Sequence, residues 1–390
     1  PAEVEAIEAF LFSQAEFRHN VITHHCEIRW TEEAGFLPLT DRDVNTLWGR
    51  MNKTVGRVYL TDIYNVIHSE FVPLFNPFQS YFDHLPSWDG VSDPIGDLAD
   101  TVHVKSDQAE FRDYFRKWFV GILPALLDDT VVNHEILVLI GEQGLYKTTW
   151  FNFLLPPELR CYFYTKTNSD RLNKDDLFSL TEFALICFEE LDGMRPAELN
   201  QLKAMVTMPY VNERAAYGRN KERHPHIASF CGTGNNVQFL TDPTGNRRWL
   251  PFEVSQIRDP HLHAIPYELV YSQAYALWKS GFCHWFSQEE IRKLNMHNSR
   301  FEVPNLEEDL IRTHFRKPFE GEAGIFVTAA DILEQISSCL RYPLSPNKIG
   351  RIMAGLEFES IRYKGKRGYI AVKKTGEDID RERRSGALGL

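Results

Sequence analysis

A short glycine-containing segment with a lysine and two threonines has the residue types that bind a phosphate group. It reads GEQGLYKTT over residues 141–149 and follows the apolar run 137–140. Glycines allow successive backbone N–H groups to face an anion, and a helix that begins directly after the loop adds positive potential. The sequence therefore predicts a strand over 136–140, a phosphate-binding loop opened by Gly141 and Gly144, and a helix over 148–155.

The side chains of this loop suggest separate roles in binding a nucleoside triphosphate. Lys147 is expected to bind β- and γ-phosphate oxygens, the Thr148 hydroxyl is expected to hold Mg²⁺, and Thr149 completes the nucleotide-binding set. Tyr146 stands where the pattern G-x-x-x-x-G-K-[ST] has its second glycine. A bulky residue held there at positive φ would cost about 1–3 kcal/mol, although Gly144 keeps a glycine at the centre of the loop. The alternative is an ordinary strand–turn–helix.

Carboxylates follow a second apolar run, in FALICFEELDG over 183–193. Hydrolysis of a triphosphate needs one acid near the metal ion and another near the attacking water. We expect Glu190 to orient or deprotonate the water and Glu189 to hold the metal ion, with Asp192 as a substitute. The alternative is a solvated strand end.

Two further segments complete an ordered set of polar residues. The apolar run in IASFCGTGNN ends near Asn235, which we expect to contact the γ-phosphate or the water, unless it only forms a turn. Arg247 and Arg248 precede another predicted strand. In an oligomeric ATPase such an arginine reaches the γ-phosphate of the neighbouring subunit and raises the rate about 10³-fold or more. Otherwise the two arginines form surface ion pairs.

The elements that must position these residues divide the chain into four predicted parts. Residues 1–130 are predicted to be mainly helical. Short apolar runs alternate with helix-like segments over 131–300, which favours an α/β domain with a mainly parallel sheet and a helical extension. The order helix, helix, hairpin over 301–375 is typical of a winged helix, and 376–390 form a tail.

Composition excludes several classes of protein. With 43% apolar residues the chain can bury large cores, and its net charge of −11 argues against coating of nucleic acid over the whole surface. The six cysteines lack C-x-x-C spacing, which indicates a reduced, cytoplasmic compartment. No apolar run reaches 18 residues, so no membrane span is expected.

Taken together, four segments resemble the virulence-associated protein E family over about residues 75–255. The resemblance implies an ATPase core of the AAA+ type, related to superfamily 3-like, primase-associated helicases of phages and mobile elements. It implies ATP and Mg²⁺ as cofactors and a homo-oligomeric, hexameric ring on DNA. A primase domain, if any, lies outside this chain or on a partner. The segments are LPSWDG (85–90), GEQGLYKTT, EELDGMRPAELNQLKAMVT and DPTGNRRWLPFEV.

The same resemblance implies a role for each motif residue. Lys147 and Thr148 act in the phosphate loop, Glu190 is the acid and Asn235 is the sensor. Arg247 or Arg248 is the finger that reaches the neighbouring subunit. Tyr146 departs from the family pattern, which puts the rate of hydrolysis in question more than the fold.

Basic residues predict where DNA would bind. Residues 341–374 contain nine Lys/Arg against two acids, and Lys364, Lys366 and Arg367 are expected to contact phosphates from the hairpin. This hairpin could instead increase solubility or dock a protein. In YGRNKERHPH (217–226), three basic residues could line the channel of a ring, contact an adjacent subunit or face water. These are Arg219, Lys221 and Arg223.

The sequence therefore favours an ATP-dependent helicase or translocase acting on single-stranded or forked DNA in replication of a phage or mobile element. Tyr146 motivates an alternative, a hydrolysis-poor nucleotide-binding protein with a DNA-binding or assembly role. A phosphotransferase using the same loop is a third hypothesis, but it predicts an acceptor pocket for which the sequence gives no sign.

Overall fold

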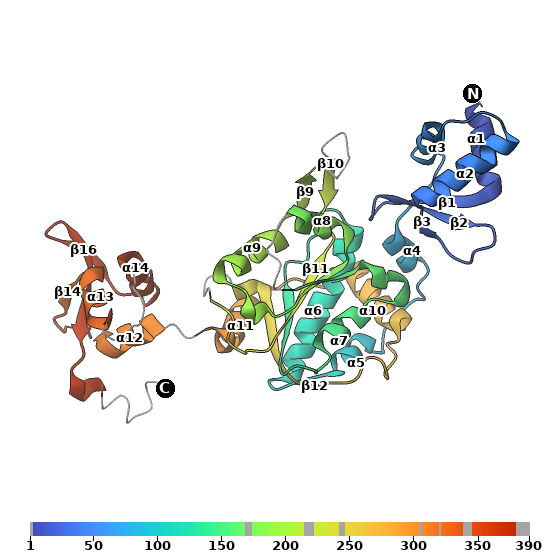
Figure 1. Ribbon diagram of the computed structural model, residues 1–390. Coiled ribbons are helices and arrows are strands. Elements are labelled where there is room, and N and C mark those ends of the chain that lie inside the picture. Colours follow the sequence, from blue (N-terminus) through green and yellow to red (C-terminus); the bar gives the residue numbers. More distant parts are fainter. Residues whose placement is uncertain are drawn as a thin grey trace. The chain divides into compact units, whose positions relative to one another are not determined.

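The chain divides into two compact units, residues 1–302 and 303–390 (Figure 1). The computed structural model describes residues 3–167, 174–213, 222–241, 246–303, 306–319, 321–337 and 345–379. None of the helices in these ranges is long and apolar enough to cross a membrane. Each unit is described by itself.

A six-stranded sheet forms the centre of the first unit. Its strand order is β5-β12-β6-β11-β8-β7, and all neighbours are parallel except β5, which runs antiparallel to β12. The protein is therefore of mixed α/β class, as predicted. The strands are β5 Val102–Val104, β6 Ile136–Ile140, β7 Phe163–Lys166, β8 Leu185–Phe188, β11 Ser229–Gly234 and β12 Trp249–Ile257.

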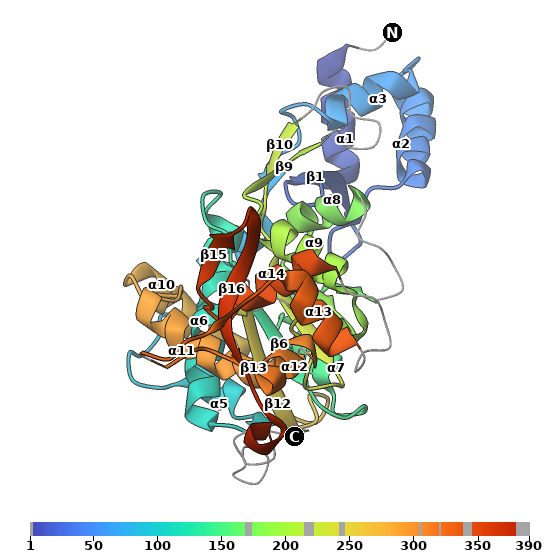
Figure 2. The same ribbon diagram turned by 90° about the vertical axis from the view of Figure 1, so that its left-hand side faces the viewer.

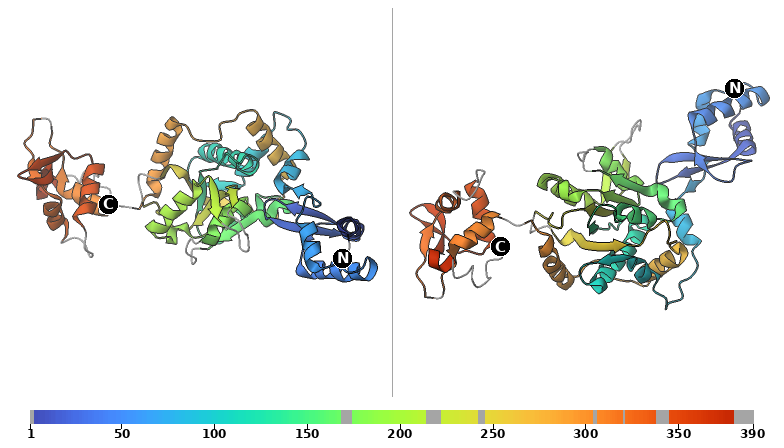
Figure 3. Two further views of the ribbon diagram at one scale, coloured as in Figure 1. Left: turned by 90° about the horizontal axis from the view of Figure 1, so that it is seen from above. Right: turned by 60° about the horizontal axis from the view of Figure 1, so that its bottom comes forward.

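Helices cover both faces of this sheet, as the left view of Figure 3 shows. Alternate residues of β6 enter two different apolar clusters, Ile136, Val138 and Ile140 in one and Leu137 and Leu139 in the other. Burial on both sides explains why this strand is an unbroken apolar run. The first cluster includes α8 (Lys174–Glu182) and α9 (Pro196–Val206), and the second includes α6 (Gln108–Leu127), α7 (Lys147–Phe153) and α10 (Tyr267–Lys279).

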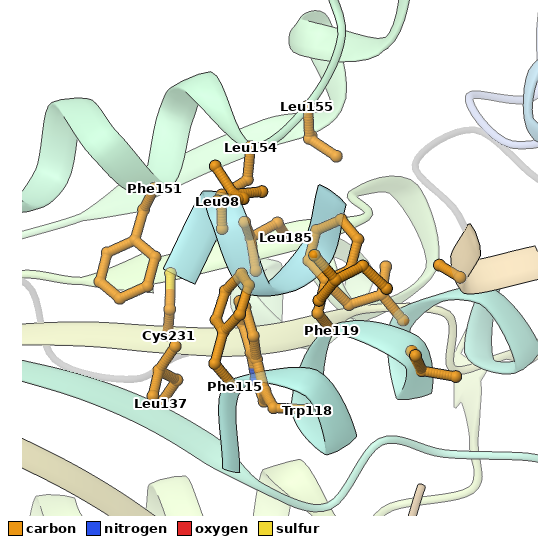
Figure 4. Close-up of a cluster of buried hydrophobic side chains, with 14 of the residues drawn as sticks. Leu98, Phe115, Trp118, Phe119, Leu137, Phe151, Leu154, Leu155, Leu185 and Cys231 are labelled. Atoms are coloured by element: carbon orange, nitrogen blue, oxygen red, sulfur yellow. The ribbon is translucent and has the colours of Figure 1, made fainter. Parts of the chain in front are cut away.

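The long helix α6 packs directly on the sheet. Phe115 lies beside Leu137 in Figure 4, and Trp118 and Phe119 belong to the same cluster; the Trp118 indole N–H donates to the carbonyl of Phe230 at 2.9 Å. The predicted boundary at residue 130 is therefore not a domain boundary, because α6 and β6 on either side of it belong to the same hydrophobic core. Cys187 and Cys231 are buried in this core, as expected of small apolar residues.

The N-terminal region is mainly helical, as predicted, but it also contains a small sheet that the prediction lacked. Its strands order as β3-β2-β1-β4, and β1 pairs antiparallel with β2. The pattern was missed because polar residues alternate there: Arg18 pairs with Glu27, and Arg29 with Glu16, across the two strands. The elements are α1 Val4–Gln14, β1 Ala15–Asn20, β2 His25–Trp30, β3 Leu37–Pro38, α2 Asp41–Thr54, α3 Leu60–Ile67 and β4 Leu74–Phe75.

The proline-rich segment 73–94 contains no long helix, because its proline density prevents one. Instead α4 (Pro77–Asp83) and α5 (Pro94–Ala99) each begin with a proline at the first helical position, where no backbone N–H is needed. The remaining elements of this unit are the strands β9 Tyr210–Glu213 and β10 Glu222–Pro225, the helix α11 Gln288–Asn298, and the 3-10 turns η1 Pro157–Tyr162, η2 Leu191–Gly193, η3 Asn246–Arg248 and η4 Ser299–Phe301.

The second unit has the predicted succession of helix, helix and hairpin, preceded by one further helix. Its core includes Ile311, Ile332, Ile349 and Met353. The hairpin β15–β16, dark red in Figure 2, closes through Lys364 and Gly365, which both have positive φ as a two-residue turn requires. The elements are α12 Leu306–His314, β13 Phe315–Arg316, β14 Ile325–Val327, α13 Ala329–Ser337, α14 Pro346–Gly355, β15 Ser360–Tyr363 and β16 Lys366–Lys373.

Candidate nucleotide-binding site

A cavity of about 350 Å³ lies where the carboxyl ends of three neighbouring parallel strands meet. Ligands of open α/β sheets bind in this kind of crevice. The loop after β6, the acids after β8 and the asparagine after β11 all line it, so the structure brings together the predicted loop, acid and sensor residues. The lining residues are Gln143, Gly144, Leu145, Tyr146, Lys147, Thr148, Thr149, Glu189, Glu190, Thr233, Gly234 and Asn235.

Lys147 is held at the loop by backbone carbonyls. Its side chain is largely buried, and Nζ donates to the carbonyls of Gly141 at 2.6 Å and Glu142 at 2.7 Å. The Asn235 Oδ1 atom lies 3.5 Å from the same nitrogen. Burial lowers the pKa of Lys147, and the nearby Asp192 carboxylate opposes that shift. The ammonium group and the Asn235 amide therefore share one end of the cavity.

The predicted magnesium ligands Thr148 and Glu189 are already in contact. Thr148 Oγ1 donates to Glu189 Oε1 at 2.7 Å, which joins the start of α7 to the end of β8. Mg²⁺ in proteins takes one or two such oxygens and completes its shell with water and substrate phosphates. No group of three or more His, Cys, Asp or Glu residues in the described ranges could hold a metal ion by itself. This pair fits a magnesium ion that arrives with a triphosphate.

Asp192 has a different role from the substitute metal ligand that we expected. Its Oδ1 accepts from the backbone N–H of Asn235 at 3.1 Å, and its Oδ2 accepts from the backbone and side chain of Asn236 at 3.1 and 2.7 Å. Gly234 permits this approach, because a Cβ there would lie 3.0 Å from Oδ1. With both oxygens engaged, Asp192 positions the end of β11 and thus Asn235.

A change of chain direction allows two consecutive glutamates to line one cavity. Glu190 has φ +54° and ψ +45°, directly after β8. Successive residues of a continuing strand would point to opposite faces, but a left-handed residue ends the strand and turns the chain. Glu189 is half-buried and Glu190 is exposed at the cavity. This arrangement suits the separate roles predicted for the two acids.

Tyr146 occupies the left-handed conformation that a glycine would adopt without strain. Its φ is +58° and its ψ is +19°, and the residue is 41% exposed. Gly144, two residues earlier, has φ +84°. The backbone of the loop thus retains the glycine-like geometry, and the tyrosine bears a local cost of about 1–2 kcal/mol.

We expect Tyr146→Gly to be more stable than Tyr146→Ala by about 1 kcal/mol in the free energy of unfolding. Both substitutions remove the exposed ring, but only glycine relieves the strain at positive φ. The urea midpoint of the two variants measures this difference. Equal midpoints would show that position 146 is not strained.

The two candidate finger arginines lie at the amino ends of the parallel strands, whereas the phosphate loop of the same chain lies at their carboxyl ends. Trp249, which directly follows them, pairs with Ile136 at the start of β6, whereas the loop begins after Ile140. Four residues of strand separate these ends by about 13 Å. Arg247 is exposed and Arg248 is half-buried, and their charges contribute to lowering the pKa of His134, after burial as the main cause.

The predicted DNA-binding residues are not part of this cavity. Arg223 lies on β10 with its guanidinium 3.7 Å from the ring centre of Tyr210. Arg219 and Lys221 lie outside the described residues. In the second unit the three predicted hairpin cations, Lys364, Lys366 and Arg367, are exposed.

Sequence reasoning missed some contributors to the site. Gln143 and Leu145 line the cavity. They occupy variable positions of the loop motif, so the motif predicts their location but not their residue types. Thr233 also lines it, at the end of β11. The clamp between Asp192 and Asn236 had no local signal, because the two residues meet only when β8 and β11 become neighbours.

Comparison with known proteins gives both a family match and similar folds. The model of the virulence-associated protein E-like domain matches residues 83–303. The apo structure of the NrS-1 C-terminal region and its A form apo structure each superpose with a TM-score of 0.50, at 11% and 10% sequence identity. Each comparison covers 95% of this chain and 99% of the other. Identity this low supports a shared fold alone. No curated protein matches the chain.

Proposed function

Because this chain belongs to the virulence-associated protein E-like family, we propose that it is an ATP hydrolase that moves along or unwinds DNA during replication of a phage or mobile element. One observation carries the proposal. Lys147, the Thr148–Glu189 pair, Glu190 and Asn235 surround one cavity, although they come from three separate segments of the chain.

Each of these residues can act on a bound triphosphate. Lys147 binds β- and γ-phosphate oxygens, with Gly141, Gly144 and Thr149 in the surrounding loop. Glu190 orients the attacking water and accepts its proton, and Asn235 contacts the γ-phosphate or that water. Thr148 and Glu189 would hold Mg²⁺, which neutralises charge on the phosphates when bound.

The strand order supports a core of the AAA+ type. β11 lies between β6, which leads into the phosphate loop, and β8, which leads into the acids. This inserted strand places Asn235 between the lysine and the glutamates. The lysine contact at 3.5 Å is a direct consequence of this order.

The position of Arg247 and Arg248 supports action as an oligomeric ring, which we propose to be a hexamer. An arginine at the amino ends of the strands is too far away to contact a phosphate bound at the carboxyl ends of the same sheet. In a head-to-tail ring, one edge of each subunit faces the other edge of its neighbour. One of the two arginines would then complete the neighbouring site.

Two basic surfaces would contact DNA. We interpret the second unit as a winged helix, whose β15–β16 hairpin presents Lys364, Lys366 and Arg367. The segment 217–226, whose sequence contains Arg219, Lys221 and Arg223, would line the channel of the ring. Such contacts bind the phosphate backbone and provide little sequence specificity.

Hydrolysis of ATP, measured with and without single-stranded DNA, tests this function. We expect turnover in the parent chain and a decrease of about 10²-fold or more in Glu190→Gln, because the amide cannot accept a proton from water. Binding of ATP should persist in this variant. Glu289→Gln, an exposed glutamate of α11, is the matched control. A parent that shows no turnover under any condition rejects the motor.

A second candidate function is a nucleotide-binding protein that hydrolyses ATP poorly and assembles on DNA. The positive φ of Tyr146 favours it, because the ring stands at the cavity where the family pattern has glycine. Firm ATP binding with near-zero turnover in both the parent and Tyr146→Gly would support this alternative.

A further inference from the structure

The two faces of the β15–β16 hairpin differ in chemistry. Directly opposed residues of an antiparallel pair share a face, and Tyr363 is opposed to Lys366, whereas Arg362 is opposed to Arg367. Tyr369 is buried in the core that the helices of this unit build. Because side chains alternate, residues 366, 368 and 370 therefore lie on the outer face, away from those helices.

The outer face carries an aromatic pair. The Phe326 ring covers Gly368, where a Cβ would approach two of its carbon atoms to 2.5 Å. The Tyr363 ring packs beside it, with 5.5 Å between ring centres. Covering Gly368 accounts for Phe326 as a structural residue of the sheet. It does not account for Tyr363, a residue that remains 53% exposed and is not a member of the core cluster.

Within the hairpin the charged residues are of one sign, and the nearby acid is Asp331, whose pKa is lowered mainly by hydrogen bonds and further by Lys366. Residues 360–374 contain six Lys/Arg and no Asp or Glu. Lys364 Nζ lies 5.3 Å from the centre of the Tyr363 ring, and Lys366 is opposed to Tyr363 across the hairpin. An exposed aromatic ring with cations on both sides fits a polyanion that also offers flat, unpaired bases. A duplex offers the phosphates but keeps its bases stacked inside.

We propose that Tyr363 stacks on an unpaired base of single-stranded DNA, while Lys364 and Lys366 contact the adjoining phosphates. The identity of the polymer as DNA rests on the proposed function. The stacking site itself rests on the aromatic pair and the charge of the hairpin. The second unit would thus distinguish single strands from duplex without reading their sequence.

Fluorescence anisotropy of the full chain tests the proposal, with labelled oligo-dT and a blunt duplex of equal length and no nucleotide present. Tyr363→Ala should weaken oligo-dT binding about 5- to 150-fold and duplex binding less than about twofold. Tyr363→Phe keeps the ring and should stay within about twofold of the parent. Lys366→Ala should weaken both DNA forms and reduce the salt dependence by about one ion.

A photo-crosslink gives a local readout that other DNA contacts do not disturb. Oligo-dT with one iodouracil should form an adduct at Tyr363 that Tyr363→Ala loses, and thermal unfolding of the variants reports whether the hairpin still folds. Equal losses on both DNA forms, an adduct elsewhere or no DNA binding by the parent overturns the stacking site. If the parent hydrolyses ATP but Tyr363→Ala does not change DNA binding, the stacking site is wrong and the proposed motor stands. If a Tyr363-dependent adduct forms but the parent does not hydrolyse ATP, the stacking site stands and the proposed motor is wrong.

Discussion

Lys147→Ala is expected to lower ATP turnover by at least about 10²-fold. The ammonium group lies in the cavity lining, 3.5 Å from Asn235, and it is the only lysine among the described residues that line that cavity. Its loss removes positive charge where the β- and γ-phosphates would sit and where charge develops during transfer. A coupled assay of phosphate release, at ATP concentrations above the parent KM, measures the effect.

Lys293→Ala is the matched control, because this lysine is exposed on α11 and pairs with the exposed Glu289. It should retain parental turnover. Circular dichroism and urea unfolding verify that both variants fold. Turnover of Lys147→Ala within a few-fold of the parent would mean that the loop does not hold the reacting phosphates.

Mixing two inactive variants should restore activity if the arginine acts between subunits. The double variant Arg247→Ala/Arg248→Ala is expected to lower turnover about 10³-fold, because the neighbouring subunit then supplies no arginine to the γ-phosphate. This variant keeps an intact phosphate loop, and Lys147→Ala keeps both arginines. In a mixed ring, about a quarter of the junctions combine the intact loop with an intact arginine, since each partner is drawn at even odds.

Turnover of the equimolar mixture, against each variant alone, is the measurement. Native mass spectrometry with an ATP analogue and DNA reports the size of the assembly, which we expect to be a hexamer. No recovery in a mixture that does form mixed rings would contradict a finger acting in trans. The single variants Arg247→Ala and Arg248→Ala then identify which arginine carries the effect, and we expect the exposed Arg247 to be the larger contributor.

Local sequence patterns predicted the strands that are buried on both faces of the sheet. The run over 136–140 became β6 because helices cover both sides of the sheet, so every residue of the strand had to be apolar. The prolines of 73–94 limited the helices there for an equally local reason, the fixed φ and the missing N–H. By contrast, the strands at 15–30 carry alternating charges that satisfy one another only across the hairpin.

The candidate site divides in the same way. The residue types and their place at strand ends were visible in the sequence, so Lys147, Glu189, Glu190 and Asn235 were identified without a structure. The clamp of Asp192 on Asn235 and Asn236 was not, because it needs β8 and β11 side by side. The left-handed backbone at Tyr146 and Glu190 was also beyond side-chain patterns, although the motif raised the question at Tyr146.

By itself, the sequence determined which groups are available for chemistry and that each follows or precedes a buried strand, since apolar runs and their polar ends are local properties. Only the tertiary structure decided where those strands lie and which way they run. The order β12-β6-β11-β8 brings the lysine, asparagine and glutamates together at the carboxyl ends of the strands. Because β12 runs parallel to β6, Arg247 and Arg248, which precede it, lie at the amino ends. Strand order depends on pairing between residues far apart in the chain, such as Trp249 with Ile136, which no local pattern specifies.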